Sequence, residues 1–399
     1  TSSDLCRFAI ALHDGRLLTQ ASLDAIWTSQ ATTEGKPTGY GLGWSIHSDG
    51  GISHGGGQSG TSTFLLHDPR RNIVVAAMCN LQGAKLSPLC RSIVDEVMST
   101  VRPFERVQQK LRDAIEREVQ EKKLPALSIT LVNGPDTVYA EGFGFVDAAK
   151  KRPATANTVY RVGSVSKLFT DIAVMQLEER GELDLDADIR VILPDFQPEN
   201  PHETPLTLRM LMSHRSGLVR ESPVGHYFDP TEPTLEETIA SLNDTTLTYA
   251  PSTRTKYSNA GVSVAGYALQ QMTKTRFEEY LKKTLLDPMG MSDSAFERTP
   301  EIDAKLADAL MWTVDGRRFK TPKFALGTAP AGSLYASVND LAKFIKVILH
   351  DGKTVGNSKE TQVIKAETLG RMMEPPTDKD GKPLPFGIGF GISEFDGEQ

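Results

Sequence analysis

The hydrophobic pattern of the first hundred residues predicts helices, then a β-hairpin, then another helix. Residues 61–67 and 73–78 read as strands, and the Asp, Pro and Asn residues between them suit a tight turn, which indicates a hairpin. Apolar positions at helical spacing predict a helix over residues 87–99, which Pro103 ends. Helices at 4–12 and 22–29 and a strand at 40–47 complete the elements expected in this region.

The middle of the chain combines two more strands with a long run of helices. A charged amphipathic helix at 105–120 precedes strands at 126–132 and 137–145. After Ser164, apolar residues recur at helical spacing as far as Gly181, which stands where a helix-ending glycine is expected. Further helices are expected at 208–213, 235–242, 262–273 and 276–285. The pattern indicates an α/β fold of the α+β type, with a sheet and packed helices beside a helical subdomain.

The two ends of the chain resemble each other. Residues 4–15 and 340–352 share the patterns Asp-Leu-x-x-Phe and Leu-His-Asp-Gly, and Tyr-Gly-Leu-Gly-Trp at 40–44 resembles Phe-Gly-Ile-Gly-Phe at 386–390. The copies lie roughly 340 residues apart, which is far too long for a solenoid repeat and is the length of a whole two-subdomain protein.

Residues 1–100 are therefore expected to be the C-terminal portion of one unit. Residues 103–399 are expected to be a second unit that stops before its own end. Such a chain is either a fragment of a tandem protein or a natural circular permutant.

Composition and charge disfavour several classes of function. The chain has 399 residues, a net charge of −7 and no block of lysine and arginine, so nucleic acid is not an expected partner. No apolar run approaches the roughly 18 residues that a membrane span needs. Cys6, Cys79 and Cys90 are too few for a disulfide framework, and the eight histidines show no metal-ligand spacing. We therefore expect no metal, no other cofactor and no membrane span.

Ser164 and Lys167 form the strongest chemical signal, an S-x-x-K sequence at a predicted helix start. Residues three apart on a helix share a face, so the hydroxyl and the ammonium are expected to lie close together. Serine needs a base to become a good nucleophile, and a lysine held among polar or cationic groups can assist. The motif is weak by itself, because an N-cap serine beside a surface lysine has the same pattern.

A second signal is the sequence Tyr257-Ser258-Asn259, in a polar stretch just before a predicted helix. A tyrosine near an ammonium can act as a phenolate-like base, and the Asn side chain offers both a donor and an acceptor to an ester or amide. A pair of turn residues is the alternative interpretation.

A third signal is the run from His54 through Gly56 and Gly57, which leads into a strand. Consecutive glycines let a ligand approach the backbone closely, and their N–H groups can bind an oxyanion. Two other motifs match this stretch, a dinucleotide fingerprint and a hydrolase nucleophile elbow. Both need a following helix, and here a strand is expected, so both are rejected.

Together, S-x-x-K, Y-x-N and H-x-G resemble the motifs of class C β-lactamases and penicillin-binding-protein-like serine hydrolases, which include the family VIII esterases. The resemblance covers nearly the whole chain. Further similar segments lie at 160–163, 206–218, 287–291 and 331–334. The order of motifs departs from the family, because H-x-G comes last there and precedes Ser164 here. This departure agrees with a tandem fragment or a permutant.

The resemblance implies a β-lactamase/transpeptidase-like fold, in which an antiparallel sheet flanked by helices lies beside a helical subdomain. The active site would lie between these two parts. Ser164 would be the acylated nucleophile, and Lys167 and Tyr257 would share the proton transfer, with the identity of the base left open. Asn259 would orient the substrate beside its carbonyl group.

The resemblance also implies that residues 1–100 complete the site that holds Ser164. The backbone N–H groups of Ser164 and Gly57 would form the oxyanion hole, with Gly56 beside them and His54 lining the opposite strand. The copies at 40–44 and 386–390 cannot both occupy one strand position. We expect the first copy to occupy it, with the last residues displaced or swapped to another molecule in a strand-swapped oligomer.

The implied reaction is acyl transfer to water by a serine hydrolase of esterase or D-Ala-D-Ala-peptidase type. The implied partners are small-molecule esters, peptides or β-lactams. A true β-lactamase is the alternative enzyme, and an inactive penicillin-recognising or structural module is the non-enzymatic alternative. The family favours a periplasmic or secreted location, although no leader is visible at the start of this sequence.

Overall fold

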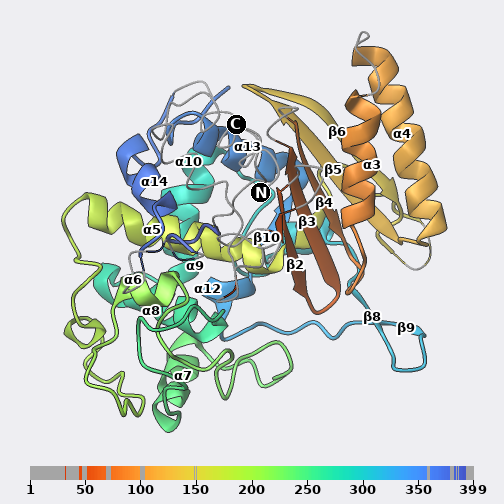
Figure 1. Cartoon of the computed structure of the whole chain (residues 1–399). Coiled ribbons are helices and arrows are strands. Elements are labelled where there is room, and N and C mark those ends of the chain that lie inside the picture. Colours follow the sequence, from red (N-terminus) through yellow and green to blue (C-terminus); the bar gives the residue numbers. More distant parts are fainter. Residues whose placement is uncertain are drawn as a thin grey trace.

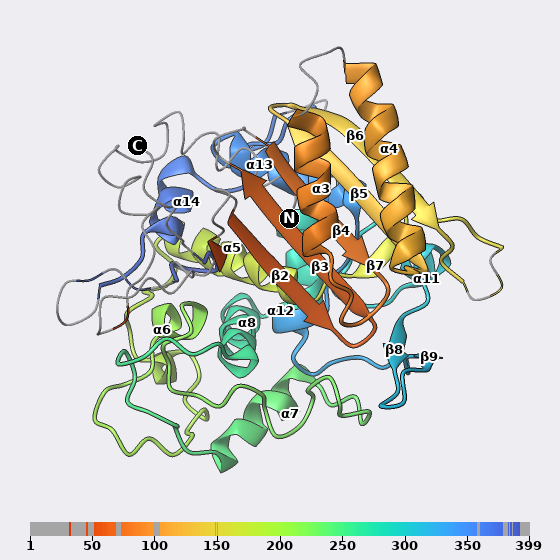
Figure 2. The ribbon, with the colours of Figure 1, turned by 45° about the vertical axis from the view of Figure 1, so that its right-hand side comes forward.

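The computed structural model describes residues 32, 45–46, 52–68, 73–98, 104–147, 149, 151–356, 360–377, 382, 384 and 386–391. The helices expected at 4–12 and 22–29, the repeated segment at 40–44 and Cys6 lie outside these residues. The described chain forms an antiparallel sheet with helices on both sides and a helix-rich region beside it (Figure 1, Figure 2). This architecture confirms the predicted fold class.

Six strands form the main sheet in the order β1-β2-β3-β4-β5-β6, and every neighbouring pair is antiparallel. The hairpin predicted within 61–78 is confirmed as β3 and β4. The bounds of the six strands are Ser45–Ile46, Ile52–Gln58, Thr61–Asp68, Ile73–Cys79, Ala126–Asn133 and Asp136–Gly144. Because β4 pairs with β5, segments from before and after residue 100 share one sheet. Their origin in two units of a tandem protein stays a prediction.

Two neighbouring helices, α3 (Ser87–Met98) and α4 (Phe104–Glu121), cover one face of this sheet (Figure 2). Both were expected, with nearly the same bounds. Strand alternation explains the core beneath them, because Leu127 and Ile129 of β5 point toward these helices and are fully buried. Ser128, between them, faces the other side of the sheet.

The opposite side of the sheet is occupied by α13 (Val338–Leu349) and α5 (Ser166–Glu179). Phe169 of α5 stacks on Phe344 of α13, with ring centroids 4.0 Å apart, and meets Phe296 edge-on at 6.3 Å. All three rings are buried, so they join the helical region to the sheet through one continuous core.

The remaining helices form the region beside the sheet. The helices predicted at 208–213, 235–242, 262–273 and 276–285 correspond to α6, α7, α8 and α9. The bounds are α6 Leu208–Met212, α7 Leu235–Ala240, α8 Asn259–Thr273, α9 Phe277–Leu281, α10 Asp287–Met289, α11 Pro300–Lys305, α12 Ala329–Gly332 and α14 Ala366–Met373. Two small antiparallel pairs connect the loops, β7 (Val159–Arg161) with β10 (Tyr335–Ser337) and β8 (Leu310–Trp312) with β9 (Arg318–Lys320).

The repeated segment at 386–390 packs into the interior of the described chain. Ile388 donates its backbone N–H to Met372 O at 2.7 Å, and the Ile388 and Phe390 side chains are buried. These residues belong to none of the six strands of the sheet, whereas Ser45–Ile46, directly after the first copy, forms β1 at its edge. The last residues are thus displaced from the strand position, as expected, and they pack beside α14 because burial of two large apolar side chains is favourable. Their exchange with another molecule stays a prediction.

Candidate active site

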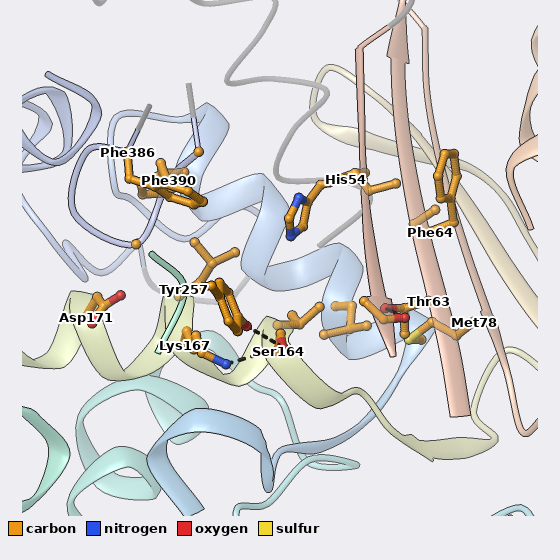
Figure 3. Close-up of a pocket in the computed structure, with 18 of the residues that line it drawn as sticks. His54, Thr63, Phe64, Met78, Ser164, Lys167, Asp171, Tyr257, Phe386 and Phe390 are labelled. Atoms are coloured by element: carbon orange, nitrogen blue, oxygen red, sulfur yellow. Dashed lines mark hydrogen bonds between the residues drawn. The ribbon is translucent and has the colours of Figure 1, made fainter. Parts of the chain in front are cut away.

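Ser164 lies in a single 3₁₀ turn, η1 (Gly163–Val165), that leads directly into α5 (Figure 3). Gly163 permits the turn because its φ of +59° lies in the region that favours glycine. Ser166 closes the turn, since its Oγ donates to Gly163 O at 2.6 Å and accepts the Leu334 N–H at 2.9 Å. The S-x-x-K spacing then places Lys167 in the first turn of α5, facing Ser164.

Two polar atoms converge on the Ser164 hydroxyl. Tyr257 Oη lies 2.6 Å from Ser164 Oγ, and Lys167 Nζ lies 3.3 Å from the same atom (Figure 3). Tyr257 comes from the loop before α8, 93 residues along the chain from Ser164. A nucleophile with two proton-carrying groups within hydrogen-bond reach has the geometry that nucleophilic catalysis needs.

The Lys167 ammonium is held inside the protein. Lys167 is only 5% exposed, and its Nζ also donates to Ala331 O on α12 at 2.7 Å. Nζ lies 4.7 Å from the centroid of the Tyr257 ring, within the range of a cation–π contact. The alternative interpretation of this motif, a surface lysine beside an N-cap serine, is therefore wrong.

His214 holds the loop that carries Tyr257 from both sides. Its backbone O accepts the Lys256 N–H at 2.8 Å, and its ring Nδ1 accepts the Ser258 N–H at 3.2 Å. Its ring also packs against the Tyr257 ring, with centroids 4.4 Å apart. His214 thus positions the phenol. The sequence indicated this residue only as one letter of the similar segment at 206–218.

Replacing His214 with Ala is expected to slow acylation of Ser164 by roughly 10- to 100-fold, because the phenol loses its fixed position. His214→Asn is the matched control, since Asn can accept the Ser258 N–H and tolerates the φ of +60° found here. The rate of labelling by a fluorophosphonate measures acylation. Equal losses in the two variants would contradict a positioning role for the hydrogen-bonded ring.

A second expectation for His214 concerns stability. Burial, and after it the charges of Lys167 and His54, lowers the pKa of the His214 ring from 6.5 to about 3. Between these values the unfolded chain binds the extra proton, so the free energy of unfolding is retained above pH 6.5 and falls as the pH drops toward 3. Urea unfolding of wild type and His214→Asn, at neutral and mildly acidic pH, measures this loss. Wild type should lose more stability on acidification, and an equal loss would refute the assignment.

The H-x-G residues lie on β2, the strand that runs past η1. His54 and Gly56 line the same cavity as Ser164, and the His54 ring points from β2 into it (Figure 3). Gly57 adjoins the serine turn, because a Cβ built on Gly163 would lie 3.7 Å from the Gly57 carbonyl group. A Cβ on Gly57 itself would meet nothing within 4 Å, so its backbone faces open space. The structure therefore brings these residues beside Ser164, and their oxyanion role stays a prediction.

The glycine run is itself a strand, in agreement with the resemblance, which placed His54 on the strand opposite Ser164. β2 pairs with β3 along its whole length, from Ile52↔His67 to Gln58↔Thr61. Gly56 has a packing reason for its identity, because a Cβ there would lie 2.4 Å from Thr63 Oγ1. Glycine has a low strand propensity, so hydrophobic periodicity does not indicate a strand here. The glycines are explained by the close approach of β3, which the sequence does not show.

Asn259 differs from the other predicted side chains of the site, because it does not line the cavity that holds Ser164. It is the first residue of α8, and its Nδ2 donates to Glu221 Oε1 at 2.7 Å. Among the described residues that line the cavity, Asn259 is not included. Contact of this amide with a substrate stays a prediction.

The cavity beside Ser164 encloses about 100 Å³ and has mostly apolar walls. Met78 lines it from the sheet, and Phe386 and Phe390 line it from the repeated segment, on the side away from the sheet (Figure 3). Asp171, farther along α5, is the carboxyl group among these lining residues. Asp171, Phe386 and Phe390 were not predicted as site residues, because the sequence pattern shows only their helical or strand periodicity.

The described part of the chain offers little for other classes of binding site. No group of three or more His, Cys, Asp or Glu side chains there is arranged to hold a metal ion. None of the helices described has both the length and the apolar character needed to span a membrane. Cys79 and Cys90 are buried free thiols.

The antiparallel sheet, the adjoining helical region and the serine turn between them define a protein of the β-lactamase/transpeptidase fold. A family model described as Beta-lactamase matches residues 1–95 and 111–398. The chain therefore belongs to the Beta-lactamase family.

Curated relatives share about a quarter of the aligned residues. Protein flp of Staphylococcus aureus strain N315 is 27% identical over 257 residues, which cover 61% of this chain and 49% of that protein. Beta-lactamase-like protein 2 of Dictyostelium discoideum is 26% identical over 282 residues, covering 68% of this chain and 50% of the relative. The chain thus spans about half the length of the curated relatives it matches.

Solved structures share the fold. The octameric penicillin-binding protein homologue from Pyrococcus abyssi has a TM-score of 0.59 and 29% identity, covering 70% of this chain and 64% of its own. EstCE1, described as a hydrolase with promiscuous acyltransferase activity, has a TM-score of 0.57 and 19% identity, covering 75% of this chain and 82% of its own. The likeness to EstCE1 shows the fold only.

Proposed function

We propose that this protein is a serine hydrolase that acts through an acyl-enzyme on an ester or amide, of the esterase or D-Ala-D-Ala-peptidase type. The observation that carries the proposal is the convergence of Tyr257 Oη and Lys167 Nζ on Ser164 Oγ, at 2.6 and 3.3 Å. The similarity to a penicillin-binding protein homologue supports the same reaction class.

In the proposed reaction, Ser164 Oγ attacks the carbonyl carbon and forms a tetrahedral intermediate. The serine proton passes to the Tyr257–Lys167 pair, which returns a proton to the leaving alcohol or amine as the C–O or C–N bond breaks. Water then attacks the acyl-enzyme, and the acid product leaves. Both groups lie within hydrogen-bond distance of Oγ, so the identity of the base stays open.

Two backbone N–H groups are proposed to stabilise the negative oxygen of the intermediate. The N–H of Ser164 lies at the N-terminal end of the η1–α5 helix, where the helix dipole favours negative charge. The N–H of Gly57 would come from β2, whose backbone adjoins the serine turn and carries no side chain at that position. Such fixed donors supply a large part of the stabilisation in acyl transfer.

Burst kinetics with p-nitrophenyl acetate and with nitrocefin separate the proposal from its alternatives. A burst of p-nitrophenol followed by steady turnover, without nitrocefin turnover, is the expected result. Turnover of nitrocefin would favour a true β-lactamase. An absence of reaction with both compounds would overturn the proposal and favour an inert module. The position of β2 beside Ser164 weighs against that module, because an inert module would follow from a site that lacks its H-x-G residues, and here His54 and Gly56 line the cavity of Ser164.

A further inference from the structure

Asp171 is a buried carboxyl group that the proposed reaction does not use. It lies on α5, seven residues after Ser164, and is 1% exposed. Neither of its carboxyl oxygens has a hydrogen-bond partner in the described part of the chain. An unsatisfied buried polar group is costly, so its presence in a cavity wall calls for a physical explanation.

The nearest cation on the helix does not provide that explanation. Lys167 stands one turn before Asp171, but its Nζ is bonded to Ser164 Oγ and to Ala331 O. Burial raises the pKa of the Asp171 carboxyl well above its usual value, and the charge of Lys167 opposes the rise only in part. A cation seated beside the group would favour its ionised form.

The walls around Asp171 have the composition of an ammonium site. Aromatic rings of Tyr257, His214, Phe386 and Phe390 line the same cavity, and Asp171 is the carboxyl group among the lining residues (Figure 3). Aromatic faces attract cations through their quadrupoles, and an adjacent carboxylate adds a full opposite charge.

Asp171 lines the cavity, and Gly389 of the repeated segment packs against its carboxyl group. A Cβ on Gly389 would lie 2.8 Å from Asp171 Oδ2, and the φ of Gly389 is +71°. Position 389 therefore keeps a bare backbone over the carboxyl group. Any side chain there would press on Asp171 and would take up space beside the carboxyl group.

We propose that Asp171 binds a cationic group, a primary alkylammonium, on the acyl portion of the substrate. This proposal rests on the proposed hydrolase function and names its substrate class. Seven residues of helix separate Ser164 from Asp171 by roughly 10 Å, so an acyl chain of about six carbons would place its terminal ammonium at the carboxylate. The favoured substrates are thus ω-amino acyl esters or amides.

A matched pair of esters tests the preference. p-Nitrophenyl 6-aminohexanoate and p-nitrophenyl heptanoate have acyl chains of equal length and differ in the terminal ammonium. Wild type is expected to prefer the amino ester by at least about 10-fold in kcat/KM. Asp171→Asn is expected to lose that preference, so that its kcat/KM for the amino ester falls to that for the heptanoate. Asp244→Asn, at an exposed site on η3 (Ser241–Asp244), is the matched charge control and should keep the preference.

Calorimetric binding of hexylamine and 1-hexanol gives a readout that needs no turnover. Tighter binding of the amine, lost in Asp171→Asn, supports the proposal. Equal binding of the two compounds, or equal kcat/KM for the two esters, overturns it and leaves the hydrolase function intact. If amine binding depends on Asp171 but neither ester reacts and Ser164 takes no label, the hydrolase function fails and the cation site stands.

Discussion

Replacement of Ser164 by Ala is expected to abolish covalent labelling by a fluorophosphonate or a fluorescent penicillin and to lower ester turnover by at least about 10⁴-fold. Ser164 Oγ is the atom on which Tyr257 Oη and Lys167 Nζ converge, and it faces the cavity bounded by β2. Removing it leaves the oxyanion donors in place but removes the bond-forming atom, so only weak residual catalysis remains.

Mass spectrometry of the labelled peptide is the direct measurement for Ser164. Ser166→Ala is unsuitable as a control, because the Ser166 hydroxyl closes the turn through Gly163 and Leu334. Ser53 and Ser59 are the informative alternatives, since both lie on or beside β2. An adduct on either residue that persists in Ser164→Ala would overturn the assignment of the nucleophile.

Lys167→Ala and Tyr257→Phe are each expected to slow acylation by about 10²-fold or more, the scale on which a general base contributes. Lys167→Ala removes the hydrogen bonds from Nζ to Ser164 and Ala331. Tyr257→Phe removes only the hydroxyl and keeps the ring packed against His214. Pre-steady-state release of p-nitrophenol measures the acylation step separately from deacylation.

Lys256→Ala is the matched control for this pair. Lys256 is an exposed neighbour of Tyr257, and its contact with His214 is made by its backbone N–H, which alanine retains. Its rate should equal that of wild type. Retention of the full acylation rate by Tyr257→Phe across about pH 6 to 9 would show that the phenol takes no part in proton transfer.

The sequence predicted those elements whose structure is decided by residues that are neighbours in the chain. The β3–β4 hairpin followed from two apolar runs around an Asp-Pro-Arg-Arg-Asn connection, and α3 and α4 followed from helical periodicity. Gly181 ends the region of α5 with a φ of +73°, as its position predicted. These elements depend on contacts within a few residues, so the sequence alone is enough to predict them.

Long-range packing decided the features that local sequence patterns do not encode. The glycine strand β2 has no apolar alternation, and its identity as a strand comes from pairing with β3. His214 becomes a support for Tyr257 only because the turn after α6 meets the loop before α8, 44 residues along the chain. Asn259 carries the expected motif letter, yet its side chain bonds Glu221, a contact that no spacing rule encodes.

The sequence by itself determined the fold class and most elements between residues 61 and 286. It also determined that Ser164, in the serine turn, lies beside Lys167, in the first turn of α5. It did so because helix and strand periodicity, turn chemistry and the three-residue spacing of Ser164 and Lys167 are local properties. Only the tertiary structure decided that Tyr257 reaches Ser164, that β2 lies beside the serine turn, and that Phe390 and Asp171 share its cavity. Those contacts join segments far apart in the chain, and they form only when the core is buried as a whole.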